Sequence, residues 1–323
     1  MKVSLVAGGA GFVGANLIGH LAQAERSVVV IDNMSRGKEQ FVSSAAVSAG
    51  RVIVIKADCS VQEEVAEAFA KASQLGDIDE VWHLAANSDI PAGVADSAVD
   101  LKDTFMTTHC LLKEMKQYQV KEIHFASSSA VYGDLGPVTL QEDIGPLLPI
   151  SNYGAMKLAS EALISAAAES FLFKANIFRF PNVVGVPATH GVILDFVNKL
   201  IGSPDQLVVL GDGTQQKAYL HVSDLVEAML LIRARETKNK IELINIGPVD
   251  EGVTVRHIAE TVVSRVSPGA KIVYGSGNKG WVGDVPKFSY STLKLQGYGW
   301  APKLGSAAAV RRAIDEVASQ LGK

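Results

Sequence analysis

Cysteine is scarce in this chain of 323 residues, which contains only Cys59 and Cys110. Two cysteines cannot form the disulfide framework of a small secreted domain, so we expect both to be reduced core residues. The chain also lacks an apolar run of about 18 residues, the length that a membrane-spanning helix needs. The first apolar run, Val3–Ala7, is too short for a signal peptide. These absences predict a cytoplasmic protein with no membrane partner.

An excess of positive charge is absent as well. The chain has 30 Lys and Arg against 34 Asp and Glu, a net charge of −4, and no basic block, so we expect no nucleic-acid partner. No His, Cys, Asp and Glu residues cluster at metal-ligand spacing, so we predict no metal site. A composition of 48% hydrophobic and 20% charged residues is typical of a globular protein with a large core.

Short apolar runs alternate with longer amphipathic segments over the first 180 residues. The apolar runs are rich in β-branched residues, as in strands that are buried on both faces, so the alternation predicts an α/β fold with a parallel sheet. The predicted strands are Val3–Ala7, Ser27–Ile31, Val52–Ala57, Glu80–Ala85, Glu122–Ser127 and Asn176–Phe180, and the predicted helices include Val61–Leu75 and Thr104–Gln119.

The pattern loosens after Pro181, where Gly and Pro become frequent and the elements become shorter. We therefore predict a doubly wound, Rossmann-type sheet in residues 1–181, rejoined by about 216–250. A smaller α+β substrate-binding domain is predicted mainly in residues 182–323. Its expected helices are Val192–Ile201, Ser223–Ala234, Val255–Val266 and Ala307–Leu321, and we expect this region to pack at one edge of the sheet.

A glycine-rich turn follows the first predicted strand and precedes a predicted helix over Ala15–Ala24. Gly8 permits a tight turn, Gly11 lets the backbone approach a pyrophosphate, and Gly14 lets the helix pack closely on the strand. The free N–H groups at the start of the helix then face the phosphates. This strand–turn–helix context predicts a dinucleotide site.

An acid closes the second predicted strand, about 20 residues beyond the glycines, where a carboxylate accepts the adenine-ribose hydroxyls. This residue is Asp32, and a carboxylate there repels a 2′-phosphate, so the sequence favours NAD over NADP. Arg36 lies nearby and could soften that preference. Asp58, which follows the third strand, is a candidate for a hydrogen bond to adenine or an ordinary turn residue.

Two later segments indicate proton chemistry. Tyr153 and Lys157 are four residues apart, which places them on one face of a helix. A lysine ammonium favours the phenolate form of a neighbouring tyrosine, which predicts a general base. The serine run Ser127-Ser128-Ser129 at a strand end would offer a hydroxyl to the same substrate oxygen.

Taken together, these motifs resemble those of the extended short-chain dehydrogenase/reductases, in particular nucleotide-sugar epimerases of the UDP-glucose 4-epimerase kind. The resemblance covers essentially the whole chain. The motifs that carry it are Gly8-x-x-Gly11-x-x-Gly14, Asp32-Asn33-Met34-Ser35, His83-Leu84-Ala85-Ala86, Ser128-x-x-x-Tyr132-Gly133, Tyr153-x-x-x-Lys157, Arg179-Phe180-Pro181-Asn182, Gly211-Asp212-Gly213-Thr214, Tyr219-Leu220-His221-Val222-Ser223-Asp224 and Gly283-Asp284.

The resemblance implies a role for many individual residues. It makes Ser128 the catalytic hydroxyl, Tyr153 the base, and Lys157 the residue that lowers the tyrosine pKa and holds the nicotinamide ribose. The implied NAD-binding residues are Gly8, Gly11, Phe12, Val13, Gly14, Asp32, Asn33, Ser35, Asp58, Cys59, Leu84, Ala85, Ala86, Tyr153, Lys157, Phe180 and Val183. The implied substrate-binding residues are Ser128, Ser129, Asn182, Val192, Lys217, Trp281 and Asp284.

The implied activity is 4-epimerisation of a nucleotide sugar through transient oxidation at C4 by NAD. UDP-glucose and UDP-galactose are the default pair, and UDP-glucuronate and UDP-N-acetylhexosamines are alternatives. A nucleotide-sugar reductase or dehydratase and a non-catalytic NAD-binding regulatory protein are competing hypotheses. Members of the family are usually homodimers that pair two helices from each subunit, which we expect here.

Some positions depart from the family pattern. Dehydratases carry Asp-Glu directly after the catalytic hydroxyl, and decarboxylases carry a Glu there, whereas this chain has Ser129 and Ala130. Lys217 and Trp281 stand where the family usually has arginines that bind the nucleotide. Thr104 stands where the family often has Asn. The departures count against dehydration and leave the identity of the nucleotide open.

Overall fold

The computed structural model describes residues 1–22, 26–42, 47–48, 50–136, 138–277 and 289–323. The chain forms two compact units that do not follow the chain order. The first unit comprises Met1–Val131, Ser151–Arg179 and Met229–Ile244, and the second comprises Tyr132–Ile150, Phe180–Ala228 and Asn245–Lys323.

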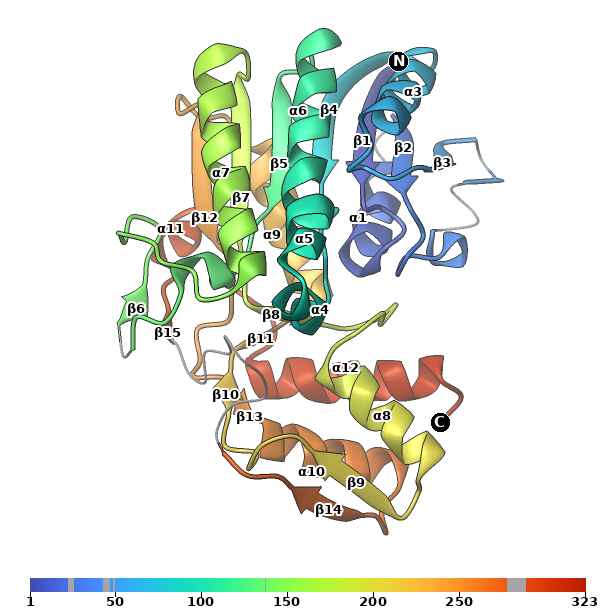
Figure 1. The fold of residues 1–323 in the computed structure, drawn as a ribbon, viewed down its shortest axis with the longest axis vertical. Helices are drawn as coiled ribbons and strands as arrows, with labels where there is room; N and C mark the ends of the chain where they lie inside the picture. Colours follow the sequence, from blue (N-terminus) through green and yellow to red (C-terminus); the bar gives the residue numbers. More distant parts are fainter. Residues whose placement is uncertain (23–25, 43–46, 49, 137, 278–288) are drawn as a thin grey trace. The chain divides into compact units, whose positions relative to one another are not determined.

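A seven-stranded sheet is the centre of the first unit (Figure 1). Its strands are β1 (Lys2–Ala7), β2 (Ser27–Asp32), β3 (Val52–Lys56), β4 (Asp77–His83), β5 (Glu122–Ala126), β7 (Lys174–Arg179) and β12 (Ile241–Asn245). Their order in the sheet is β12-β7-β5-β4-β1-β2-β3, and the pairs from β7 through β3 are parallel. The chain order reverses beside β1, as in a doubly wound sheet, which confirms the predicted α/β fold class.

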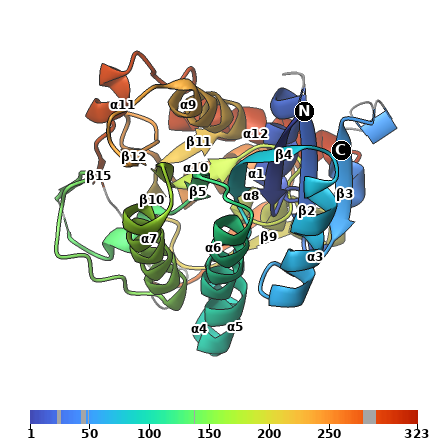
Figure 2. The same ribbon diagram turned by 90° about the horizontal axis from the view of Figure 1, so that it is seen from above.

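Helices cover this sheet because a parallel sheet buries both of its faces. The helices of the first unit are α1 (Phe12–Ala22), α3 (Gln62–Ser73), α4 (Ile90–Ala95), α5 (Ser97–Asp100), α6 (Thr107–Gln117) and α7 (Asn152–Ser170). Figure 2 shows α3, α6 and α7 side by side on one face. Short 3₁₀ turns span Glu39–Phe41 and Ser129–Tyr132, and a π-helical segment, η2, spans Leu101–Met106.

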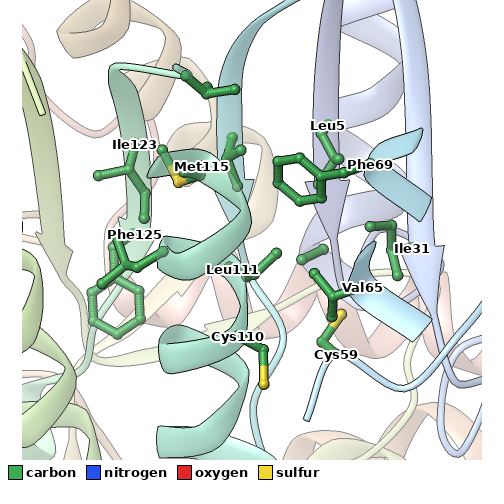
Figure 3. Close-up of a cluster of buried hydrophobic side chains, with 14 of the residues drawn as sticks. Leu5, Ile31, Cys59, Val65, Phe69, Cys110, Leu111, Met115, Ile123 and Phe125 are labelled. Atoms are coloured by element: carbon green, nitrogen blue, oxygen red, sulfur yellow. The ribbon is translucent and has the colours of Figure 1, made fainter. Parts of the chain in front are cut away.

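The core beneath these three helices is apolar and fully buried (Figure 3). Phe69 of α3 and Leu111 and Met115 of α6 pack with Leu5 and Ile123 of the sheet. Each such side chain stabilises the fold by roughly 1.5–3 kcal/mol when it leaves water. Cys59 and Cys110 lie in the same core as free, buried thiols, as predicted.

The second unit has its own core, formed by α8 (Val192–Gly202), α10 (Val255–Val266) and α12 (Ser306–Gln320) against β9, β11 and neighbouring segments. Its other helices are α11 (Leu293–Gly297) and α9 (Val222–Ala234), which continues into the first unit. Its strands pair as β8 (Asn182–Val184) with β11 (Tyr219–His221), β9 (Gln206–Val209) with β14 (Lys271–Tyr274), β10 (Gln216–Lys217) with β13 (Val253–Thr254), and β6 (Thr139–Leu140) with β15 (Ser289–Tyr290).

Some predicted boundaries differ from the observed ones. The first helix begins at Phe12 rather than Ala15, because the helix accommodates Gly14 in its first turn despite the low helix propensity of glycine. The predicted helix Thr104–Gln119 combines the end of η2 with α6.

Among the described residues, no helix is both long enough and apolar enough to span a bilayer.

Candidate active site and dinucleotide cradle

The glycine-rich turn is closely packed against the end of β4. The φ angle of Gly8 is +75°, a left-handed conformation that favours glycine. A Cβ atom at Gly8 would lie 2.6 Å from the backbone nitrogen of Ala85, and one at Gly14 would lie 2.5 Å from Cα of Gly9. At Gly11 a Cβ atom would lie 3.3 Å from the backbone oxygen of Gly8, which is a tight contact. All three glycines therefore lie where a side chain would crowd the turn, as in the glycine cradle that binds a pyrophosphate.

Asp32 closes β2 beside this turn. Its Oδ2 accepts a hydrogen bond of 3.0 Å from the backbone N–H of Ala10, and its Oδ1 accepts one of 2.9 Å from Met34. Burial raises the pKa of Asp32, and these two backbone hydrogen bonds oppose the rise. Each carboxylate oxygen can accept a second hydrogen bond, so the residue fits the predicted contact with ribose hydroxyls.

The remaining predicted contacts of the adenosine lie on neighbouring loops of the first unit. Asn33 accepts a backbone hydrogen bond from Ser35. Asp58 accepts hydrogen bonds from the hydroxyl and backbone N–H of Ser60, and Lys102 Nζ lies 3.0 Å from its other oxygen. Burial raises the pKa of Asp58, but these partners hold it below the ordinary value. The sequence left open whether Asp58 binds adenine or shapes a turn; the Ser60 contacts show that it shapes the turn, and the contact with adenine stays a prediction.

The catalytic candidates converge at the carboxyl end of β5. Ser151 caps the first turn of α7 by accepting a hydrogen bond from the backbone of Gly154, which starts the helix just before Tyr153. Tyr153 and Lys157 lie one turn apart, and Lys157 Nζ lies 5.9 Å from the centroid of the tyrosine ring. The hydroxyl of Ser128, which follows β5, is hydrogen-bonded to the Tyr153 phenol. The structure thus brings the three predicted catalytic residues together.

Burial dominates the acid–base chemistry of this group. It raises the pKa of Tyr153 to about 12, while the hydrogen bond with Ser128 lowers it and the charge of Asp100 raises it further. Burial also lowers the pKa of Lys157 to about 7, opposed by the carboxylates of Glu161 and Asp100. The sequence predicts that the lysine lowers the tyrosine pKa, but in the structure burial raises that pKa and the group that lowers it is Ser128, not Lys157.

Lys157 is held in a defined position. Its ammonium group donates a hydrogen bond of 2.6 Å to the backbone oxygen of Ala126 and lies 4.6 Å from the centroid of the Phe125 ring. Its side chain is 2% exposed. The contact with the strand end directs the lysine toward the loop that carries Ser128.

We expect the stability of the protein to rise with pH between about 7 and 10 because of Lys157. In the unfolded chain this lysine keeps its ordinary pKa of 10.5, whereas in the folded chain it releases its proton near pH 7. The unfolded state therefore binds more protons over this interval, and linkage makes the free energy of unfolding increase with pH. Urea unfolding at about pH 6.5, 8 and 9.5 should show this rise, and Lys157→Met should flatten it. If the free energy of unfolding of Lys157→Met rose equally with pH, a group other than Lys157 would be the cause.

Two carboxylates near the catalytic pair were not predicted from the sequence. Asp100 ends α5 and is 1% exposed; its side chain is hydrogen-bonded to Asn87 and Thr104, while its Oδ2 has no hydrogen-bond partner among the residues that the structure describes. Glu161 lies one turn beyond Lys157 on α7 and is also buried. The spacing of Tyr153, Lys157 and Glu161 at i, i+4 and i+8 was the signal that could have indicated Glu161.

Apart from Ser129, the other predicted substrate contacts belong to the second unit or fall outside the described residues. Asn182 and Val183 lie on β8, which begins two residues after Phe180, and Lys217 lies on β10. Val192 is the first residue of α8. Trp281 and Asp284 lie in the segment 278–288, outside the described residues. Ser129 begins the short turn after Ser128 in the first unit.

In the first unit, two buried residues, Glu80 and His124, and the partly exposed Glu122 lie close enough together to share a cation. Ligand atoms of Glu80, Glu122 and His124 lie within 4.8 Å of one another. However, the oxygens of Glu80 already accept hydrogen bonds from Ser4, His124 and two arginines. A cation would have to displace both guanidinium groups. We therefore interpret Glu80 and its partners as a structural network of ion pairs.

Comparisons with known proteins agree with this geometry. Residues 4–247 match the model of the NAD dependent epimerase/dehydratase family. A Streptomyces lividans UDP-glucose 4-epimerase is 31% identical over 271 residues, which cover 80% of this chain and 79% of that protein. A crystal structure of a UDP-galactose 4-epimerase has a TM-score of 0.85 at 33% identity, covering 99% of this chain and 100% of that one. A Thermus thermophilus UDP-glucose 4-epimerase in complex with NAD has a TM-score of 0.84 at 27% identity, covering 98% and 99%.

Proposed function

Because the chain belongs to the NAD-dependent epimerase/dehydratase family, we propose that it is an enzyme that interconverts UDP-glucose and UDP-galactose. Its cofactor is NAD, which the glycine cradle and Asp32 fit. The observation that carries the proposal is the cluster of Ser128, Tyr153 and Lys157, with the serine hydroxyl bonded to the phenol.

In this proposal, Tyr153 takes the proton of the sugar 4-hydroxyl and later returns it. Ser128 shares its hydrogen bond with the same substrate oxygen, and Lys157 holds the nicotinamide ribose while its ammonium stabilises the phenolate. NAD, which the glycine-rich turn, Asp32 and Lys157 would hold, would supply reversible hydride acceptance from C4. The epimerisation has no net change of oxidation state, so the cofactor could stay bound between turnovers.

The residues after the catalytic serine support epimerisation over dehydration. Loss of water from the sugar needs an acid and a base beyond the tyrosine. The two positions that follow Ser128 are Ser129 and Ala130, and neither carries an acidic group. The oxidised sugar therefore meets no carboxyl group at these positions that would remove a second proton.

We further assign roles to the two units. The first unit contains the cradle and the catalytic cluster and binds NAD. The second unit contains Asn182, Val192 and Lys217 and binds the nucleotide sugar, together with Trp281 and Asp284. Lys217 meets a phosphate as a point charge, where an arginine would form a bidentate fork.

An assay without added cofactor tests the proposed function. The purified protein is incubated with UDP-glucose, UDP-glucuronate and UDP-N-acetylglucosamine, and the products are examined for the C4 epimers. UDP-galactose as the main product supports the proposal. A requirement for stoichiometric NAD(P)H would instead indicate a reductase, and bound NAD without turnover of any sugar would indicate a regulatory protein.

We also propose that the protein is a cytoplasmic homodimer. The two free, buried cysteines suit a reducing compartment. The family resemblance favours pairing through two helices, for which α6 and α7, packed side by side, are the candidates. Light scattering after gel filtration should give twice the chain mass of 34.2 kDa, and the mass of one chain would refute the dimer.

A further inference from the structure

We propose that Glu161 is a positioning residue of the catalytic site. Its buried carboxylate links the ends of β5 and β7 to α7, the helix that carries Tyr153 and Lys157, through hydrogen bonds. The proposal rests on the epimerase function assigned above and adds a residue that contacts neither NAD nor the sugar in that mechanism. Glu161 would act through Lys157 and through the loop that presents Ser128.

The first of these links is a hydrogen bond between α7 and the residue that follows β5. The hydroxyl of Ser127 donates a short hydrogen bond to Oε1 of Glu161, and Ser127 is 1% exposed. Ser127 directly precedes Ser128, so the bond fixes the backbone from which the catalytic hydroxyl projects. A shift of this loop would change the hydrogen bond between Ser128 and Tyr153.

The second link is a salt bridge between α7 and the last residue of β7. Nε of Arg179 donates a hydrogen bond of 2.9 Å to Oε1 of Glu161, and its Nη2 donates one of 2.6 Å to Oε2. This bidentate pair is buried, with exposures of 3% for Arg179 and 6% for Glu161. Bidentate pairs fix orientation as well as distance. Arg179 is the last residue of β7 and directly precedes Phe180, the residue predicted beside the nicotinamide.

The third effect of Glu161 is electrostatic. Its carboxylate lies one helical turn from the ammonium of Lys157 and opposes the fall in the pKa of that lysine, as Asp100 does from α5. The other titratable groups around the lysine are Tyr153 on its own helix and His83 on β4. His83 is buried, and its pKa is held well below the ordinary value, so it adds no positive charge near neutral pH.

The test uses variants that remove the charge without leaving a buried ion unpaired. Glu161→Gln alone removes the carboxylate that pairs with the buried Arg179 guanidinium, so the main variant is Glu161→Gln with Arg179→Gln. The matched control is Glu80→Gln with Arg233→Gln, which neutralises another acid–arginine pair of the first unit that has a buried carboxylate, while Arg26, the second arginine on Glu80, keeps its ion pair with Asp79. All variants are studied as full-length proteins with bound NAD.

We expect the Glu161/Arg179 variant to lose about tenfold or more in kcat near neutral pH, with KM changed less than about threefold. The acidic limb of its pH profile of kcat should move to higher pH. Without the Glu161 carboxylate, Lys157 loses its proton at lower pH, and a neutral lysine no longer stabilises the phenolate of Tyr153. The rise of stability with pH should also begin at lower pH. The control should lose stability only, with kcat and both pH curves unchanged.

Unchanged kcat and unchanged pH curves in the Glu161/Arg179 variant would overturn the proposal, as would a loss of kcat without movement of either curve. If that variant does not fold, Ser127→Ala tests the proposal instead, because it removes only the hydrogen bond between Ser127 and Glu161. Its kcat should fall several-fold, and Ser127→Thr should restore kcat. Wild-type kcat in Ser127→Ala would then refute the positioning role. The stability curves require no turnover, so they remain informative even if the protein proves not to be an epimerase.

Discussion

Replacing Tyr153 by Phe is expected to reduce kcat by about 10³-fold or more, since a positioned acid–base group contributes about 10²–10⁴-fold and the proposed mechanism assigns the proton transfer to Tyr153. The ring itself remains, so its packing on α7 is preserved. NAD should still bind, because the cradle and Asp32 are untouched. Steady-state kinetics together with the absorbance of the bound cofactor check both parts of this expectation.

Tyr118→Phe provides the matched control. Tyr118 follows α6 and packs against Phe69, with 5.6 Å between the ring centroids. Removing its hydroxyl should leave kcat within about twofold, because most surface substitutions away from special features change little. A Tyr153→Phe variant that retains near-normal kcat would show that another group moves the proton of the 4-hydroxyl.

Replacing Gly14 by Ala is expected to weaken NAD binding strongly and to destabilise the first unit. The added Cβ would lie 2.5 Å from Cα of Gly9 and 2.6 Å from the backbone oxygen of Gly8. Because both neighbours are backbone atoms of the cradle, the glycine turn itself must move. Such overpacking costs about 1–3 kcal/mol, and the displaced turn should bind the pyrophosphate less well. Thermal unfolding and NAD titration measure the two effects.

Gly19→Ala is the internal control for this substitution. Gly19 lies on the same helix, α1, and a Cβ atom there would meet nothing within 4 Å. Alanine favours a helix by about 1 kcal/mol over glycine, so this variant should be as stable as the wild type or slightly more stable. Its NAD affinity should be unchanged. Equal losses at Gly14 and Gly19 would argue against the close packing at the turn.

Much of the fold could be predicted from the sequence because its signals are local. Continuous β-branched runs give buried parallel strands, and the observed β1, β2, β3 and β5 agree with the predicted ones within one residue. The start of α1 was misplaced because packing on the strand tolerates Gly14 inside the helix. The π-helical segment over Leu101–Met106 leaves no periodic signal, so it merged with the predicted helix.

The site could be predicted only in part. The spacing of Tyr153 and Lys157 and the turn at Gly8 follow from short motifs, and the structure places them as expected. The balance of pKa values could not be predicted, because it depends on how deeply the phenol and ammonium are buried. Asp100 and the contacts of Glu161 were also missed, because they join segments that are distant in sequence and meet only in the folded sheet.

The fate of the hydrogen at C4 tests the central claim most directly. UDP-glucose that carries deuterium at C4 is incubated with the protein in ordinary water without added cofactor, and the UDP-galactose formed is analysed by mass spectrometry and NMR. Transient oxidation by bound NAD takes the deuteride from C4 and returns it to C4, so the galactose product should keep the label at that carbon. Loss of the label to solvent, or no UDP-galactose at all, would contradict the account.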